Sequence, residues 1–195
     1  FEVTVSDSKS GTALGAAYKQ VDAISDLPKV APNGFKIKVR GDAEAVEDDY
    51  YVKFQTNDGS STGISDGGWV EDVGFDEFIS LDPNTLPQKL VNTGTHTFTL
   101  GACTWTDKQV GDDDTNPFPS FFLIDPDDTN NPKKKGKRII SNIFFYKNRL
   151  GFLSEGSVIL SEAGEYFNFF RTTVRSLLDA DPIDVDVAST KVNKL

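Results

Sequence analysis

The sequence has very little of what catalytic and metal sites are commonly made from. Its 195 residues include one cysteine (Cys103), one histidine (His96) and no methionine. A single cysteine excludes an intramolecular disulfide, so the fold does not depend on an oxidising compartment. One Cys and one His cannot supply the ligands of a usual zinc site, and a Ser-His-Asp mechanism would have to use His96. We expect His96 on a strand surface, on the face opposite Thr97, and Cys103 as a small buried side chain on a strand.

Long apolar runs and an excess of positive charge are also missing. No run approaches the roughly 20 apolar residues that span a bilayer, so we expect no membrane-spanning segment, and no signal peptide opens the chain. The 20 Lys and Arg stand against 30 Asp and Glu, which gives a net charge of −10. This balance disfavours binding to nucleic-acid phosphate. The strand-like start and the absence of methionine favour an interior fragment of a longer polypeptide.

Alternation of apolar and polar residues is the main structural signal, and it predicts strands. A stretch of apolar residues three or four apart at Ala13–Ile24 predicts a short helix instead. Ile124–Arg138 is polar and punctuated by proline, which indicates an exposed loop. The predicted strands are Phe1–Val5, Phe35–Val39, Tyr50–Thr56, Trp69–Val73, Thr95–Ala102, Ile143–Lys147, Arg149–Ser154, Ser157–Ser161 and a last strand through Ile183, Val185 and Val187.

These elements predict a mainly-β fold of the α+β class with short helices. An antiparallel sheet module occupies residues 1–100. A loop-rich region, residues 101–195, contains three consecutive strands whose turns lie near Asn148 and at Glu155-Gly156. Such a β-meander is the kind of unit that forms a sheet or a propeller blade, and we expect it to belong to a larger domain. The 15 phenylalanines predict an aromatic core.

Acidic clusters are the only candidates for a metal site. Asp112, Asp113 and Asp114 carry the oxygen ligands that calcium prefers, but their spacing does not match a D-x-D-x-D-G calcium loop. The alternative is a turn cluster in which these side chains accept hydrogen bonds from backbone N–H groups. Asp125–Asn131 has the same two interpretations. The basic run Lys133–Arg138 follows an acidic one, which favours a solvated loop over a phosphate site.

Paired carboxylates leave an enzymatic alternative open. Glu155, Glu162 and Glu165 lie near Arg149, and two carboxylates can perform glycoside hydrolysis. Such pairs also occur by chance, and Arg149, flanked by apolar residues, is suited to binding a carboxylate or carbonyl between strands or subunits. No phosphate-binding loop, dinucleotide fingerprint or nucleophile elbow is present. We therefore expect no cofactor and no catalytic residues.

Seven motifs in one order resemble the tail tubular protein B family, the nozzle proteins of short-tailed bacteriophages. Two departures concern the loop Leu123–Arg138, which is longer than the usual connection, and Gln88, where the family often has His. The motifs are LPKVAPNGFKIKVRGDA (Leu27–Ala43), YYVKF (Tyr50–Phe54), WVED with Trp69 and Glu71, TLPQKLV (Thr85–Val91), GDDDTNPFPSF (Gly111–Phe121), NIFFYKNRLGFLSEGSVILSEAGEYFNFF (Asn142–Phe170) and DADPIDVDVAST (Asp179–Thr190).

The resemblance implies a structural virion protein located in the phage tail. Family members assemble as a ring, generally a hexamer, dock below tail tubular protein A, help carry the tail fibres and form the channel through which genomic DNA leaves. An acidic lining would keep DNA from adhering to that channel. Alternatives from other classes are a carboxylate-dependent glycan-degrading tail enzyme and a calcium-stabilised adhesion module.

Within the resemblance, one group of residues is expected to form a structural motif. The meander is expected to end in an aromatic plug, with Phe145 and Phe169 both buried, so that replacing either ring would unfold or aggregate the chain. The expected motif residues are Arg149, Phe145, Phe152, Phe167, Phe169, Asp181 and Pro182.

Overall fold

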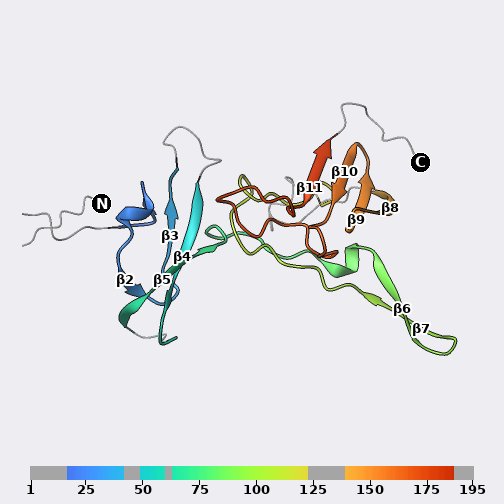
Figure 1. Cartoon of the computed structure of the whole chain (residues 1–195), viewed down its shortest axis with the longest axis horizontal. Helices are drawn as coiled ribbons and strands as arrows, with labels where there is room; N and C mark the ends of the chain where they lie inside the picture. The colour runs from blue at the N-terminus through green and yellow to red at the C-terminus, as the bar shows by residue number, and fades with distance from the viewer. Residues whose placement is uncertain (1–16, 42–48, 60–62, 123–138, 187–195) are drawn as a thin grey trace, which may run out of the picture. The chain divides into compact units, whose positions relative to one another are not determined.

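A computed structural model describes residues 17–41, 49–59, 63–122 and 139–186 (Figure 1). The chain forms two compact units, Phe1–Gly74 and Phe75–Leu195. The sequence-based division after residue 100 put most of the hairpin at residues 88–102 in the first part, whereas the structure groups the whole hairpin with the second unit. The predicted strand Phe1–Val5 and the loop Leu123–Arg138 lie outside the described residues.

The first unit is a five-stranded sheet in the order β1-β3-β4-β5-β2. Strands β3, β4 and β5 are antiparallel neighbours, β1 pairs in parallel with β3, and β2 pairs antiparallel with β5. The three sequence-predicted strands of this region are confirmed, although the third begins earlier than expected. The strands are β1 (Gln20–Val21), β2 (Val30–Pro32), β3 (Lys36–Val39), β4 (Tyr50–Thr56) and β5 (Ile64–Asp72).

One face of this sheet is covered by apolar side chains. The alternating residues of β3 and β4 bury Ile37, Val39 and Val52 in one cluster, as expected for a half-buried sheet. Phe54 is fully buried, and its ring meets Trp69 edge-on at 5.1 Å. The Trp69 indole donates a hydrogen bond of 2.9 Å to the Pro28 carbonyl, so the buried polar atom of this large side chain is satisfied.

The helix predicted for Ala13–Ile24 is wrong in its described part, which starts at residue 17. Strand β1 occupies Gln20–Val21, and a 3₁₀ turn follows at Ile24–Asp26. Backbone groups here bond across to β3, since Lys38 N donates to the Lys19 carbonyl and Arg40 N to the Val21 carbonyl. These non-local bonds replace those of a helix, and Tyr18, part of the supposed helical stripe, is exposed.

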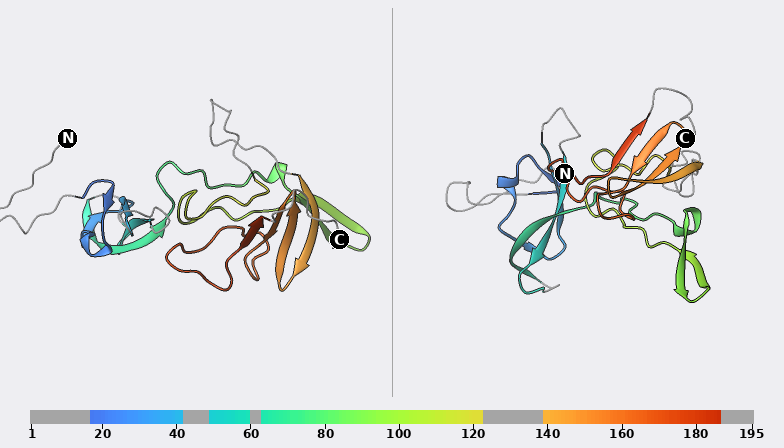
Figure 2. Two further views of the ribbon diagram at one scale, coloured as in Figure 1. Left: turned by 90° about the horizontal axis from the view of Figure 1, so that it is seen from above. Right: turned by 45° about the vertical axis from the view of Figure 1, so that its right-hand side comes forward.

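The second unit contains a separate hairpin and a four-stranded antiparallel sheet in the order β11-β10-β9-β8 (Figure 2). The predicted three-stranded meander is confirmed and is extended by β11, which pairs with β10. The mainly-β α+β class is therefore confirmed. The strands are β6 (Gln88–Gly94), β7 (Thr97–Ala102), β8 (Ile140–Tyr146), β9 (Arg149–Ser154), β10 (Ser157–Leu160) and β11 (Ile183–Asp186).

Left-handed residues make the tight reversals of this unit. Lys147 and Asn148 have φ values of 47° and 60° between β8 and β9, and Glu155 has 50° between β9 and β10. The positions predicted for both turns are correct. His96 also has a positive φ, 58°, because it lies in the β6–β7 turn. The expectation of a strand-surface histidine is wrong: pairing of Gly94 with Thr97 leaves Thr95 and His96 to reverse the chain.

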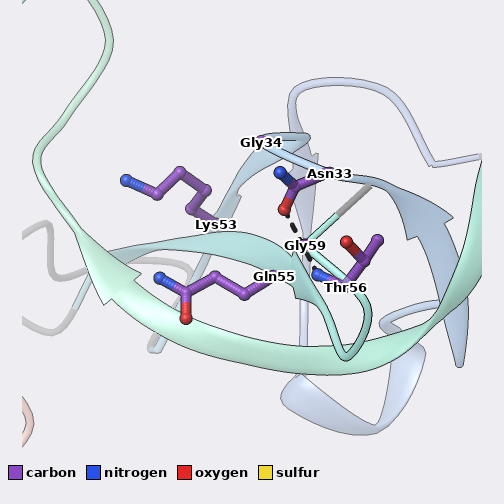
Figure 3. A pocket seen from close by; sticks show the side chains of 6 residues that line it. All are labelled: Asn33, Gly34, Lys53, Gln55, Thr56 and Gly59. Carbon is purple, nitrogen blue, oxygen red and sulfur yellow. Dashed lines mark hydrogen bonds between the residues drawn. The ribbon is translucent and has the colours of Figure 1, made fainter. Parts of the chain in front are cut away.

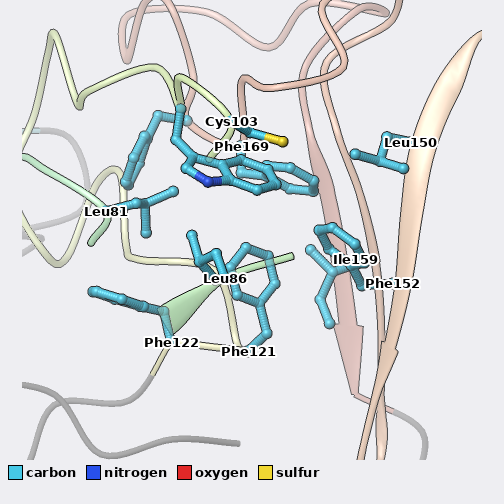
Figure 4. Packing of buried hydrophobic residues seen from close by; sticks show 11 residues of the cluster. Leu81, Leu86, Cys103, Phe121, Phe122, Leu150, Phe152, Ile159 and Phe169 are labelled. Carbon is cyan, nitrogen blue, oxygen red and sulfur yellow. The ribbon is translucent and has the colours of Figure 1, made fainter. Parts of the chain in front are cut away.

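Aromatic side chains fill the core of the second unit (Figure 4). Phe152 and Phe169 stack with ring centroids 5.3 Å apart, and Phe121 meets both rings edge-on at 5.2 Å. Cys103 is buried, as predicted, immediately after β7. The whole cluster comprises Leu81, Leu86, Cys103, Trp105, Phe121, Phe122, Leu150, Phe152, Ile159, Phe169 and Phe170.

The expectation that Phe145 is a buried ring is wrong. Its side chain is 69% exposed, whereas Phe169 is only 4% exposed. Phe145 is paired with the core residue Leu150, so its ring lies on the core side of the sheet, but β8 is the outermost strand and leaves the ring at the margin of the core. Its contact is an edge-on pair with the Tyr166 ring at 5.7 Å.

Candidate functional site

A buried arginine is the centre of the second unit's polar structure. Arg149 opens β9 and is 7% exposed. Its Nη1 lies 2.6 Å from the Ser161 carbonyl oxygen, 2.7 Å from that of Asp181 and 3.1 Å from that of Ala180. Its Nη2 lies 2.7 Å from the Asp179 carbonyl oxygen. The guanidinium therefore ties both ends of the β10–β11 connection to β9, the carbonyl-binding role that its apolar surroundings suggested.

The carboxylate of Asp181 holds the end of the same connection. Its Oδ2 accepts a hydrogen bond of 2.9 Å from the backbone N–H of Leu178, and it lies 3.4 Å from Arg171 Nε as an ion pair. Pro182 separates Asp181 from β11 and lines an open pocket of about 210 Å³ beside Ile159. Asp181 and Pro182 are thus brought beside Arg149, while Phe152, Phe167 and Phe169 belong to, or pack against, the aromatic core.

A buried lysine forms a second polar centre that sequence reasoning missed. The Lys108 side chain has no exposed surface. Its ammonium lies 2.7 Å from Asp113 Oδ1 and 3.7 Å from Glu77 Oε2. It also lies 4.6 Å from the centre of the Phe118 ring, a cation–π distance. The sequence gives no periodic signal for Lys108, because it lies between strands and its partners are distant or in a turn.

Buried amides fasten the loops around these two centres. Asn116 donates from Nδ2 to the carbonyls of Val110 and Arg171 and accepts at Oδ1 from the Arg171 backbone N–H. Asn168 donates to Glu162 Oε2 at 2.6 Å and accepts from the backbone N–H of Phe170. Asn116 therefore joins segments 55 positions apart, whereas Asn168 holds its own loop, and side chains fix these loops where strand pairing is absent.

The aspartate cluster has the contacts of a turn. Asp112 Oδ1 accepts from the backbone N–H groups of Asp114 and Thr115 and from the Thr115 hydroxyl. Asp113 is paired with Lys108. Across the described residues, no group of three His, Cys, Asp or Glu side chains could hold a metal ion. Asp112 therefore caps backbone N–H groups, while Asp113 forms an ion pair with Lys108.

The carboxylates considered for glycan hydrolysis are placed in a loop of the same scaffold. Glu162 is bonded to Asn168, and its backbone pairs with that of Glu165 in an isolated bridge. Glu155 lies in the β9–β10 turn, away from both in the chain. The structure gives Glu162 a positioning contact, and it does not single out a pair of carboxylates facing a substrate cavity.

The first unit contains a cluster of two lysines around one carboxylate. Asp72 Oδ2 lies 2.9 Å from Lys36 Nζ, and Oδ1 lies 3.1 Å from Lys53 Nζ. Burial opposes ionisation of Asp72, but hydrogen bonds and charge from Lys36 and Lys53 outweigh it, so the pKa of Asp72 is lowered from 3.8. Lys36 also donates to the Val73 carbonyl at 2.8 Å, which fixes the chain as it leaves β5.

An open pocket of about 350 Å³ lies beside the β4–β5 turn of the first unit (Figure 3). Asn33 Oδ1 accepts a hydrogen bond of 3.2 Å from the Thr56 backbone N–H across it. Lys53 and Gln55 extend from one strand of the rim. Its residues offer neither a nucleophile with a base nor a metal-binding set, so the pocket has no evident chemistry.

An apolar groove of about 200 Å³ lies in the second unit, beside strand β8. It reaches the base of the β6–β7 hairpin at Pro87, Gln88 and Lys89. Trp105 also lines it, and the indole N–H of this buried residue has no hydrogen-bond partner among the residues that the structure describes. The remaining lining residues are Cys103, Ile143, Phe145, Leu150, Phe152, Tyr166 and Phe167.

Comparison with known proteins decides the family. A family model described as bacteriophage nozzle protein matches residues 1–195. The chain belongs to the bacteriophage nozzle family. The nozzle chain is also similar to tail tubular protein gp12 of Escherichia phage T7, with 32% identity over 189 residues. This match covers 97% of the chain and 21% of that relative, so the chain spans about a fifth of the relative's length.

The family assignment confirms the resemblance carried by the seven ordered motifs. The nozzle chain is a structural component of the phage tail in the virion. No helix among the described residues is long and apolar enough to cross a membrane. The buried Arg149 and Lys108 thus belong to the scaffold of a tail protein.

Proposed function

We propose that the nozzle chain forms part of the wall of a tail channel through which genomic DNA leaves the virion. In this proposal the full protein assembles as a ring, a hexamer, that docks on tail tubular protein A and helps carry the tail fibres. The family match over the whole chain carries the proposal. The role in assembly is structural, and no step of it requires catalysis.

The charge distribution supports a conduit for DNA. The net charge of −10 repels phosphate, and the buried cations Arg149 and Lys108 are engaged by carbonyls or carboxylates. A channel must let DNA pass without holding it, and buried cations cannot contribute phosphate contacts. A ring structure of the assembled nozzle tests the idea, because a lumen lined mainly by Lys and Arg at this level would contradict it.

The role in the tail is tested in particles. We expect Arg149→Ala, introduced into the nozzle protein of the phage, to yield particles with DNA-filled heads that lack the distal tail and fail to deliver DNA. An exposed substitution outside the second unit, Lys29→Ala, is the control and should leave plaque formation unchanged. Normal tails and full infectivity in the Arg149→Ala phage would refute the structural role assigned to this unit.

The enzymatic alternative has a direct test. The chain is incubated with host peptidoglycan and capsular polysaccharide, alongside Glu162→Gln and Glu165→Gln variants. We expect no release of reducing sugar from any of the three proteins. Turnover by the unsubstituted chain that both variants abolish would replace the structural proposal with a carboxylate-dependent hydrolase.

A further inference from the structure

The β6–β7 hairpin is an exposed arm with one apolar face. It forms a two-stranded sheet of its own, and every residue of β6 is exposed. Leu90 is paired with Leu100, and Asn92 with Phe98, so these side chains share a face. Leu90, Leu100 and Phe98 are 66%, 69% and 58% exposed. A lone two-stranded hairpin is marginally stable in water, so this arm gains from a surface that covers its apolar face.

The groove beside β8 is apolar, as is the exposed face of the arm. Ile143 and Tyr166 lie in it with Phe145, and all three side chains are exposed. Among the described strands β8 is also an edge of its sheet, and an edge strand has backbone groups on one side that can pair with another chain. The unpaired indole N–H of buried Trp105, which lines the groove, lacks an acceptor within the described residues. An incoming strand carries such acceptors in its backbone carbonyls.

These two surfaces differ from the rest of the molecule because their spans of sequence contain no acidic residue. The sequence has no Asp or Glu from Pro83 to Thr106, the span that contains the arm, and none from Ile139 to Ser154, which contains β8. All 30 acidic residues lie elsewhere in the chain, whose net charge is −10. Two copies that meet through other surfaces bring like charges together, which opposes association. The arm and the groove can meet without that repulsion.

We propose that the groove receives the β6–β7 arm of a second copy of the same chain. The proposal rests on the ring assembly proposed above and names the surfaces that join neighbouring subunits. A protruding arm and a hollow are different surfaces, so the contact is head-to-tail, and each copy still offers one free arm and one free groove. Head-to-tail contacts repeat around a rotation axis and close into rings. Neither surface carries a carboxylate, and Lys89 lines the groove.

Sedimentation of the 195-residue chain tests the contact. We expect species larger than the monomer as the concentration rises to about 1 mM, the weak end of specific affinity. Leu100→Asp on the arm and Phe145→Asp in the groove should each raise the dissociation constant by about tenfold or more, since a buried carboxylate is costly. Leu177→Asp is the matched control, because Leu177 is 85% exposed and lies outside both surfaces. It should associate as the unsubstituted chain does.

Mixing the two variants tests the head-to-tail geometry. The Leu100→Asp chain keeps an intact groove and the Phe145→Asp chain keeps an intact arm, so an equimolar mixture should form heterodimers although neither variant associates alone. Circular dichroism first establishes that both variants are folded. If either is unfolded, Leu100→Ser and Phe145→Ser replace them in the same experiment.

The outcomes separate this inference from the proposed function. A chain that stays monomeric at about 1 mM, or variants that associate like the unsubstituted chain, would overturn the arm-and-groove contact and leave the tail role intact. A mixture that stays monomeric would overturn the head-to-tail geometry. If the arm-and-groove contact forms but the Arg149→Ala phage has normal tails, the proposed function is refuted and the contact stands.

Discussion

At the scale of single residues, the most informative feature is that buried charge is satisfied by different means in different places. Arg149 is bound by carbonyl oxygens, Lys108 by carboxylates and an aromatic face, and Asp72 by two lysines. Removing one partner leaves another buried polar group uncompensated, which costs more than the lost bond itself. Substitutions at these positions should therefore be among the most destabilising in the chain.

Arg149→Ala should lower the free energy of unfolding by about 3 kcal/mol or more, since it removes the guanidinium that donates to the buried carbonyls of Ser161 and Asp181. Arg149→Lys should recover only part of this loss, because a single ammonium cannot reproduce the planar guanidinium. Urea unfolding monitored by circular dichroism measures both effects, with Lys89→Ala as an exposed control. Equal midpoints for Arg149→Ala and the unsubstituted chain would refute this assignment.

Two phenylalanines, one buried and one exposed, should differ in how much they contribute to stability. Phe169→Ala should cost about 3–5 kcal/mol, as for other buried rings, because it removes the stack on Phe152. Phe145→Ala should change the stability of the monomer by no more than about 0.5 kcal/mol, because its ring is exposed. Thermal melts at a dilution that keeps the chain monomeric compare them. A large loss in Phe145→Ala would show that its ring supports the fold.

The stability of the first unit should depend on pH through Asp72. Its pKa is lower in the folded protein than the ordinary 3.8. The ion pairs therefore contribute in full above about pH 4 and are lost as the pH falls through the folded-state pKa. Asp72→Asn should be less stable at pH 7, and its deficit should shrink on acidification. The exposed neighbour Asp66→Asn is the control, and a deficit independent of pH would contradict the charge argument.

At the scale of elements, two adjacent glycines in β5 test how closely the strands pack. A Cβ on Gly67 would lie 2.1 Å from the Gln55 carbonyl oxygen and 2.8 Å from the Phe54 ring, whereas a Cβ on Gly68 meets nothing within 4 Å. Gly67→Ala should destabilise the first unit by about 2 kcal/mol through forced separation of β4 and β5. Gly68→Ala should be nearly neutral. Similar melting temperatures for both variants would show that β5 shifts freely.

Strands and turns with local signals could be predicted from the sequence. Tyr50–Thr56 and Arg149–Ser154 alternate or carry branched and aromatic residues between turn signals, and both are strands at those bounds. Strand β1 could not be predicted, because two residues acquire strand geometry only by pairing with β3. Phe145 and Phe169 have the same apolar character, so only the three-dimensional packing distinguishes an exposed ring from a core ring.

Part of the candidate site could likewise be predicted, where the signal lies in neighbouring residues of the sequence. The apolar neighbours of Arg149 indicated a buried guanidinium bound to carbonyls or carboxylates, and the structure supplies the carbonyls. Lys108 and Asn116 were missed, because their partners come from a turn and from residues more than fifty positions away. Charge patterning reports which residues are acidic or basic, but it does not report which of them are brought together.

At the scale of the whole molecule, the chain is two compact units whose acidic residues act mainly on the surface and in turns. A calcium-stabilised module would need carboxylates free to bind the ion, whereas Asp112 and Asp113 are already engaged. We expect addition of EDTA or of calcium to leave the melting temperature unchanged within error. A rise in melting temperature with calcium that Asp112→Asn abolishes would restore the adhesion alternative.

The contacts of Arg149 also impose an order on the folding of the chain during its synthesis. Strand β9 leaves the ribosome well before residues 179–181. When the β8–β10 meander is complete, the Arg149 guanidinium therefore still lacks most of its hydrogen-bond acceptors. The segment Asp179–Asp186 then supplies three carbonyls and a fourth strand together. A nascent chain stalled before this segment should remain sensitive to protease, and release of the segment should make the second unit resistant in one step.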